Sequence, residues 1–138
     1  MVSIVGTGNV AWSLTKAFRS AGVQIDTILA RNEAEGKALA ELANVDYLSM
    51  SEADKCPSKV ILLCISDDAL SEVNSSYDWP DQACLAHTSG PTSMKVLSFH
   101  GKCGVFYPLQ SMNKEETPDF SEVPVLLEAS SPACLILL

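Results

Sequence analysis

Apolar and polar positions along the chain alternate in blocks that predict strands and helices in turn. Residues Val2-Ser3-Ile4-Val5 form a short, mostly apolar strand. Between residues 10 and 21 the apolar positions recur at helical spacing, and Gly22 follows as a signal for the end of the helix. Residues 23–30 have the pattern of a second strand. The chain therefore begins with strand, helix and strand.

The same alternation continues to the other end of the chain. Residues 59–65 are nearly all apolar, which is typical of a parallel strand buried on both faces. We expect Asn32 to cap the second helix, and Asp67 or Asp68 to cap the third. Further strands are predicted at 45–48, 82–87, 104–107 and 123–127, helices at 32–43, after 66–68 and around Met94 and Leu97, and a polar connection with room for one helical turn at 51–57. Strands that alternate with helices predict an α/β fold with a doubly wound, mostly parallel sheet.

A glycine-rich turn, Gly6-Thr7-Gly8-Asn9-Val10-Ala11, joins the first strand to the first helix. Gly6 allows a sharp turn, Gly8 leaves room for a pyrophosphate, and Ala11 lets the helix pack closely on the strand. The helix N-terminus offers free N–H groups and a partial positive charge to phosphates. This context predicts a Rossmann NAD(P)-binding fold with residues 6–10 at the cofactor. The alternative is a glycine-rich turn in another α/β protein, such as a methyltransferase.

The end of the second strand, Ala30-Arg31-Asn32, indicates which dinucleotide is bound. NAD-binding domains usually carry Asp or Glu about here, about 20 residues beyond the glycine motif, because a carboxylate accepts hydrogen bonds from the ribose hydroxyls. A guanidinium instead pairs with a 2′-phosphate through charge and forked hydrogen bonds. We therefore expect NADP as the cofactor, with Arg31 and Asn32 among its contacts. The alternative is a solvated arginine at a strand end.

Composition excludes several classes of protein. The 138 residues suffice for one domain, and a net charge of −8 without a basic stripe argues against a nucleic-acid partner. The five cysteines form no Cys-x-x-Cys pair, and with two histidines they give no metal-binding pattern. This cysteine usage predicts a reducing, cytoplasmic compartment. No signal peptide or membrane-length apolar run is present, so no membrane partner is expected.

Four segments carry a resemblance to a known family. They are Gly-Thr-Gly-Asn-Val-Ala at 6–11, Ser-Asp-Asp at 66–68, His-Thr-Ser-Gly at 87–90 and Gly-Val-Phe-Tyr-Pro-Leu-Gln-Ser at 104–111. Together they resemble bacterial Rossmann-type NADP oxidoreductases that carry a C-terminal helical domain of unknown function. These are similar in turn to pyrroline-5-carboxylate reductases and to 6-phosphogluconate dehydrogenase-like enzymes. The segments at 87–90 and 104–111 are the more specific part of the resemblance.

Candidate catalytic and ribose-binding residues lie where strands end, and in doubly wound sheets ligands bind beyond those ends. Ser66 could hydrogen-bond a ribose or a phosphate. His87 could act as a general acid near the nicotinamide, because its ordinary pKa of about 6.5 suits proton transfer at neutral pH. Ser89 could hold a substrate carboxylate or carbonyl. The alternative is that His87 and Thr88 only fix the turn.

The sequence thus predicts a dinucleotide-binding domain over residues 1–130 and the start of a truncated helical segment at 131–138, opened by Ser131-Pro132. The resemblance implies a helical domain that builds a homodimer and closes the active site. The predicted function is the NADP-binding part of an oxidoreductase that transfers a hydride between the nicotinamide and a small oxo acid, hydroxy acid or imine. The alternative is a non-catalytic dinucleotide-binding module or a truncated remnant.

Overall fold

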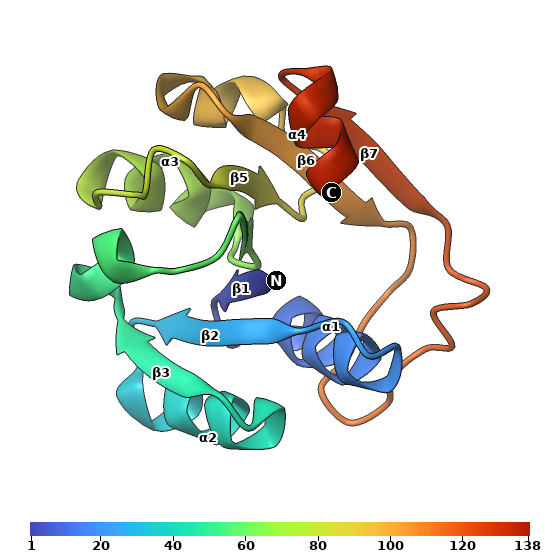
Figure 1. The fold of residues 1–138 in the computed structure, drawn as a ribbon. Coiled ribbons are helices and arrows are strands. Elements are labelled where there is room, and N and C mark those ends of the chain that lie inside the picture. The colour runs from blue at the N-terminus through green and yellow to red at the C-terminus, as the bar shows by residue number, and fades with distance from the viewer.

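A seven-stranded sheet forms the centre of the molecule (Figure 1). The structure is a computed structural model that describes residues 1–138 except the side chain of Asn74. The strands are β1 (Val2–Val5), β2 (Ile25–Ala30), β3 (Asp46–Ser49), β4 (Val60–Leu63), β5 (Cys84–His87), β6 (Cys103–Pro108) and β7 (Val125–Ala129). The helices are α1 (Asn9–Ser20), α2 (Glu33–Ala43), α3 (Asp67–Ser76) and α4 (Pro132–Leu137), with 3₁₀ helices η1 (Met50–Lys55) and η2 (Met94–His100).

The strand order is β3-β2-β1-β4-β5-β6-β7. Strands β1 to β6 pair in parallel, and β7 pairs antiparallel with β6. The chain first winds outward from β1 to β3 and then crosses to β4, on the other side of β1. This order confirms the predicted doubly wound, mostly parallel α/β fold of the Rossmann class. It also places a topological switch point between β1 and β4, where such folds bind ligands.

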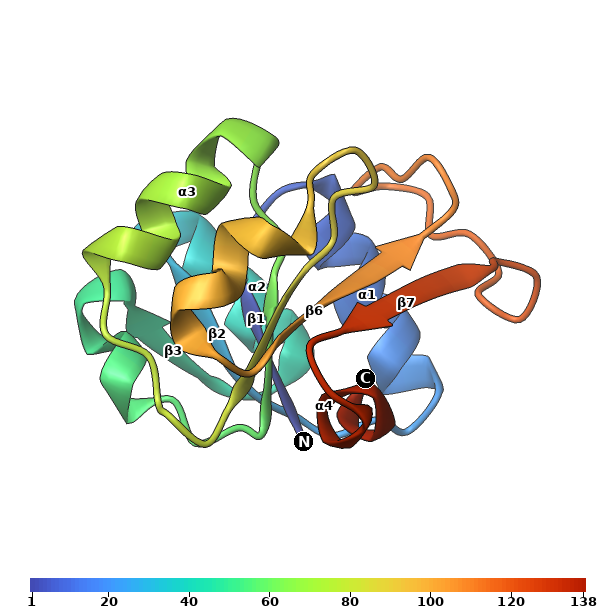
Figure 2. The same ribbon diagram turned by 90° about the horizontal axis from the view of Figure 1, so that it is seen from above.

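Strands β1 and β4 are buried on both faces, because helices cover both sides of the sheet (Figure 2). Alternate residues therefore enter two separate cores. Val5 and Leu63 join the core beneath α3, η1 and η2. Ile4 and Leu62 join the core beneath α1 and α2. This arrangement explains the nearly unbroken apolar run at 59–65 and fixes the strand ends that frame the switch point.

The structure confirms the predicted helices and corrects details of their ends. Asn32 caps α2, and its side-chain oxygen accepts a hydrogen bond from the Glu35 backbone N–H at 3.1 Å. The prediction that Asp67 or Asp68 caps α3 is wrong. Ser66 is the cap residue, and the aspartates are the first two helical residues, where the helix dipole favours negative charge. The element around Met94 is a 3₁₀ helix.

The segment from β7 onward lies at the edge of the sheet opposite β3. Strand β7 begins two residues later than the predicted strand. Ser131 caps α4 by accepting a hydrogen bond from the Cys134 backbone N–H, and Pro132 occupies the first turn, as the Ser-Pro pair predicts. Cys134 is buried, whereas Ile136 is 85% exposed. The segment 131–138 is thus partly packed on the sheet and partly open to solvent.

Candidate dinucleotide-binding site

A cavity of about 470 Å³ opens at the carboxyl ends of β1, β2 and β4. This volume falls within the range of roughly 300–1,000 Å³ that is usual for small-molecule sites. All eight residues predicted to contact the cofactor line it, although they come from three separate stretches of the chain. They are Gly6, Thr7, Gly8, Asn9, Val10, Arg31, Asn32 and Ser66.

The glycine turn forms one wall of the cavity. Gly6 has a φ of +108°, and a Cβ added there would lie 2.3 Å from the Cys64 carbonyl oxygen. Only glycine fits this position without a shift of the backbone. Gly8 has no such steric restriction, because no atom lies within 4 Å of a Cβ added at this residue. The space in front of Gly8 is therefore open to a ligand.

The N-terminus of α1 is free to meet an anion. Its cap residue is Gly8, no side chain caps the helix, and its first turn contains no acidic residue. The unpaired N–H groups and the positive end of the helix dipole therefore face the cavity without a competing carboxylate from α1. Backbone N–H groups in this arrangement bind phosphate in many α/β folds.

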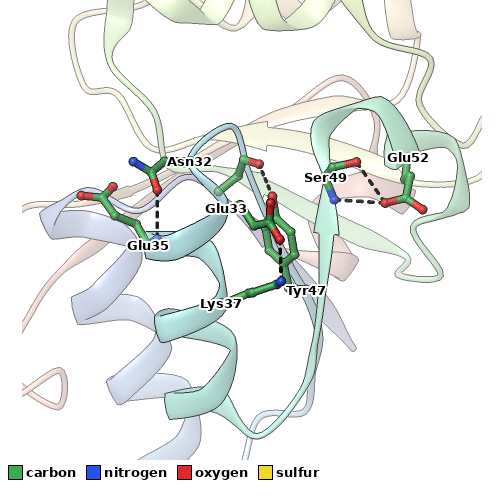
Figure 3. A network of polar contacts seen from close by, with 8 residues as sticks. Asn32, Glu33, Glu35, Lys37, Tyr47, Ser49 and Glu52 are labelled. Atoms are coloured by element: carbon green, nitrogen blue, oxygen red, sulfur yellow. Dashed lines mark hydrogen bonds and ion pairs between the residues drawn. The ribbon is translucent and has the colours of Figure 1, made fainter.

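A second part of the lining comes from the end of β2 and the start of α2. Arg31 is exposed, and its guanidinium has no hydrogen bond or ion pair among the described residues. Asn32 is engaged as the cap of α2 (Figure 3). Glu35 also lines this part of the cavity, and its Oε2 accepts a hydrogen bond from Thr7 Oγ1 at 2.7 Å. This hydrogen bond ties the glycine turn to α2.

Several uncharged residues that also line the cavity were not predicted from the sequence. Cys64 and Ile65 follow β4 directly and precede Ser66, and Thr88 follows β5. Burial raises the pKa of the Cys64 thiol to about 12, so this group stays neutral. The signal was available, because residues beside Ser66 at the same strand end must share its surroundings. Glu35 gave no such signal, since its spacing is that of an ordinary exposed helix residue.

His87 and Ser89, the predicted catalytic residues, lie beside the cavity and do not line it. The His87 side chain is fully buried, and its Nδ1 accepts a hydrogen bond from the Ser89 backbone N–H at 3.2 Å. Burial lowers the pKa of the His87 imidazole, which favours its neutral form. The Ser89 hydroxyl donates to Thr92 Oγ1 at 2.8 Å. Thr88, between them, is the residue of this turn that reaches the cavity.

The two more specific segments of the sequence meet at this turn. A Cβ added at Gly90 would lie 2.5 Å from the ring of Tyr107, which belongs to β6. Glycine at position 90 thus allows the tyrosine ring to pack directly on the backbone of the 87–90 turn. This contact joins the 87–90 turn to β6.

Comparison with known proteins agrees with this geometry. Residues 1–88 match the family described as NADP oxidoreductase, coenzyme F420-dependent, and the chain belongs to this family. Its domain is therefore an NAD(P)-binding oxidoreductase domain. The glycine turn and the α1 terminus fit the dinucleotide, and we assign none of the described residues to coenzyme F420. A search of curated protein sequences finds no match.

Solved structures of similar fold include a Bacteroides fragilis protein assigned as an NADP oxidoreductase, with a TM-score of 0.82 and 29% identity over 98% of this chain and 53% of its own. Prephenate dehydrogenase from A. aeolicus, solved with NAD⁺, has a TM-score of 0.80 and 18% identity over 99% and 54%. Pyrroline-5-carboxylate reductase from Streptococcus pyogenes has a TM-score of 0.64 and 15% identity over 78% and 42%. The family match and the Bacteroides fragilis structure thus confirm the resemblance to NADP oxidoreductases, and the resemblance to pyrroline-5-carboxylate reductases is confirmed for the fold. The chain spans about half the length of these structures or less.

Neither a membrane-spanning helix nor a metal centre is found in the part of the chain that the structure describes. No helix there is long and apolar enough to cross a membrane. No group of three His, Cys, Asp or Glu side chains there is arranged to hold a metal ion.

Proposed function

We propose that this chain is the NADP-binding domain of an oxidoreductase that moves a hydride between the nicotinamide and a small oxo acid, hydroxy acid or imine. One observation carries the proposal. Residues from the glycine turn, the end of β2 and the end of β4 line a single cavity at the switch point of the sheet. The hydride chemistry would belong to the nicotinamide, and the protein would bind and orient it.

NADP is favoured over NAD by the free guanidinium of Arg31. The pyrophosphate would lie in the open space before Gly8, against the N–H groups of α1. The adenosine ribose would then reach the end of β2, where a 2′-phosphate can pair with Arg31. A carboxylate at position 31 would repel that phosphate.

Titration calorimetry of the 138-residue chain with NADPH and NADH tests this proposal. Tighter binding of NADPH is expected. Arg31→Asp should weaken NADPH binding roughly ten- to a hundred-fold and leave NADH binding less affected, because it removes a charged hydrogen-bond partner worth about 1.5–3 kcal/mol. Equal affinities for the two cofactors, or tighter NADH binding, would refute the assignment.

His87 and Ser89 stay our candidates for the chemistry on the substrate, because His87 ends β5 and Ser89 follows it, at the same edge of the sheet as the cavity. The burial of His87 favours a second candidate function, a dinucleotide-binding module without catalysis, in which this residue only shapes the turn. An assay of NADPH oxidation against small oxo acids and imines separates the two. In a catalytic domain, His87→Gln and Ser89→Ala lower turnover with little change in cofactor affinity.

We further propose that catalysis requires a helical domain, which would also build a homodimer. The exposed side chains of Leu135, Ile136 and Leu137 on α4 support a contact surface there. Light scattering and steady-state kinetics on this chain, with and without a family helical domain attached, test the idea. Full turnover by a monodisperse 138-residue monomer would overturn it. The five free cysteines support the further proposal of a reducing, cytoplasmic compartment.

A further inference from the structure

We propose that Glu35 is a specificity-determining residue that opposes Arg31 within the same cavity. Its carboxylate would accept a hydrogen bond from a ribose hydroxyl of NADH and would repel the 2′-phosphate of NADPH. Cofactor choice would then depend on the balance between the two side chains. This inference rests on the proposed function, because it assumes that the cavity binds a dinucleotide.

The Glu35 carboxylate lies in the cavity, beside the glycine turn. Glu35 stands in the first turn of α2 and lines the cavity together with Arg31. Its Oε2 is 2.7 Å from the hydroxyl of Thr7, which lies between the two glycines of the turn. The hydrogen bond holds the carboxylate against the glycine turn, on the side of the cavity that α2 forms. Figure 3 shows Glu35 beside Asn32 at the N-terminal end of this helix.

The two charged side chains of the cavity are not neutralised by ion pairs among the described residues. The ion pairs among the described residues join Lys37 to Glu33 and Lys55 to Glu52. Arg31 and Glu35 therefore have no ionic partner, although both line one cavity. The cavity wall thus carries one unpaired cation and one unpaired anion. A phosphate monoester carries about −1.5 to −2 charges at neutral pH, so the two side chains must act on it in opposite directions.

A carboxylate is the usual ligand of the free ribose in NAD-binding domains. In NAD-binding domains the carboxylate that accepts from the ribose usually stands about 20 residues beyond the glycine motif, near the end of the second strand. Here Arg31 occupies that region. The carboxylate that lines the cavity belongs to Glu35, about one helical turn after Arg31 in the chain. The positive end of the α2 dipole stabilises a negative charge there without a cation. The chain therefore carries a ligand for the 2′-phosphate and a ligand for the free ribose.

Calorimetric titrations of the wild-type chain, Glu35→Gln and Glu33→Gln with NADPH and NADH test the inference. Glu33 is the matched control, since it is on the same helix and is exposed, but does not line the cavity. Glutamine keeps the shape of Glu35 and an acceptor for Thr7. We expect Glu35→Gln to tighten NADPH binding and to weaken NADH binding. The ratio of NADPH affinity to NADH affinity should rise roughly tenfold or more. Arg31→Asp should change the same ratio in the opposite direction. Glu33→Gln should leave the ratio unchanged.

Fragment ligands locate the effect at the ribose. The same shift should appear with adenosine 2′,5′-bisphosphate against adenosine 5′-monophosphate, which lack the nicotinamide. An equal change for both cofactors in Glu35→Gln, or no change, overturns the inference and leaves the proposed function standing, because the carboxylate then only holds the turn. A wild-type chain that binds neither cofactor refutes the proposed function, and this inference with it.

Discussion

The two glycines of the turn should respond in opposite ways to substitution. At Gly6, alanine would be forced to adopt a φ of +108° and to place its Cβ 2.3 Å from the Cys64 carbonyl oxygen. A strained backbone conformation costs about 1–3 kcal/mol, and overpacking costs a similar amount. Gly6→Ala should therefore lower the free energy of unfolding by about 2–6 kcal/mol. That is a large share of the roughly 5–15 kcal/mol that holds a domain together.

At Gly8 the backbone already suits any residue, with φ of −76° and ψ of −176°, and an added Cβ meets no protein atom within 4 Å. Gly8→Val should change the free energy of unfolding by only about 1 kcal/mol or less. It should nevertheless abolish NADPH binding, because the valine side chain fills the space that the pyrophosphate needs.

Urea denaturation followed by circular dichroism, together with a cofactor titration, measures both effects. The wild-type chain and the two variants are compared under the same conditions. A Gly6→Ala variant as stable as the wild type would contradict the close approach to Cys64. Undiminished NADPH binding by Gly8→Val would show that the turn serves the fold alone.

Further predictions concern the cap, the thiols and the buried imidazole. Asn32→Ala should lower the free energy of unfolding by about 1 kcal/mol in urea denaturation, through loss of the α2 cap, and an unchanged midpoint would contradict this role. Burial raises the pKa values of the Cys64 and Cys84 thiols to about 12. Mass spectrometry should therefore find both cysteines unmodified by a thiol reagent at pH 8 until the chain is unfolded. Rapid labelling of Cys64 in the folded chain would refute its burial. Burial lowers the pKa of His87, so the unfolded chain binds more protons below about pH 6.5, and stability should fall as the pH drops from there toward the folded-state pKa. His87→Gln should flatten that slope, and an equally steep slope in the variant would mean that other groups cause it.

Periodicity and turn chemistry predicted most of the fold. The run at 59–65 is apolar because both of its faces are covered, and Asn32 caps a helix because its side chain competes for a backbone N–H. The cap of α3 was assigned to the wrong residue, because serine and aspartate are nearly equal caps and stand side by side in Ser66-Asp67-Asp68. The choice between serine and aspartate depends on where β4 ends and α3 begins, which the local sequence does not specify.

That the candidate cofactor residues line one cavity was predictable, because strand ends converge in a parallel sheet. Gly6, Arg31 and Ser66 are far apart in sequence, yet each follows a strand that ends at one edge. The surroundings of single side chains were not predictable in this way. The burial of His87 depends on how the 88–93 turn folds back, and the contact of Glu35 with Thr7 depends on where α2 sits against the glycine turn. The burial of His87 and the contact of Glu35 both depend on tertiary packing, which cannot be predicted from a local sequence pattern.

NADPH binding in the cavity at the switch point can be observed directly. The most direct measurement is nuclear magnetic resonance mapping of backbone amides as NADPH is added to the 138-residue chain. We expect saturable shifts at Gly6 to Val10, at Arg31 and Asn32, and at Ser66 and Thr88, and none of these shifts in Gly8→Val. Shifts confined to other parts of the chain, or no shifts at millimolar NADPH, would contradict binding in this cavity.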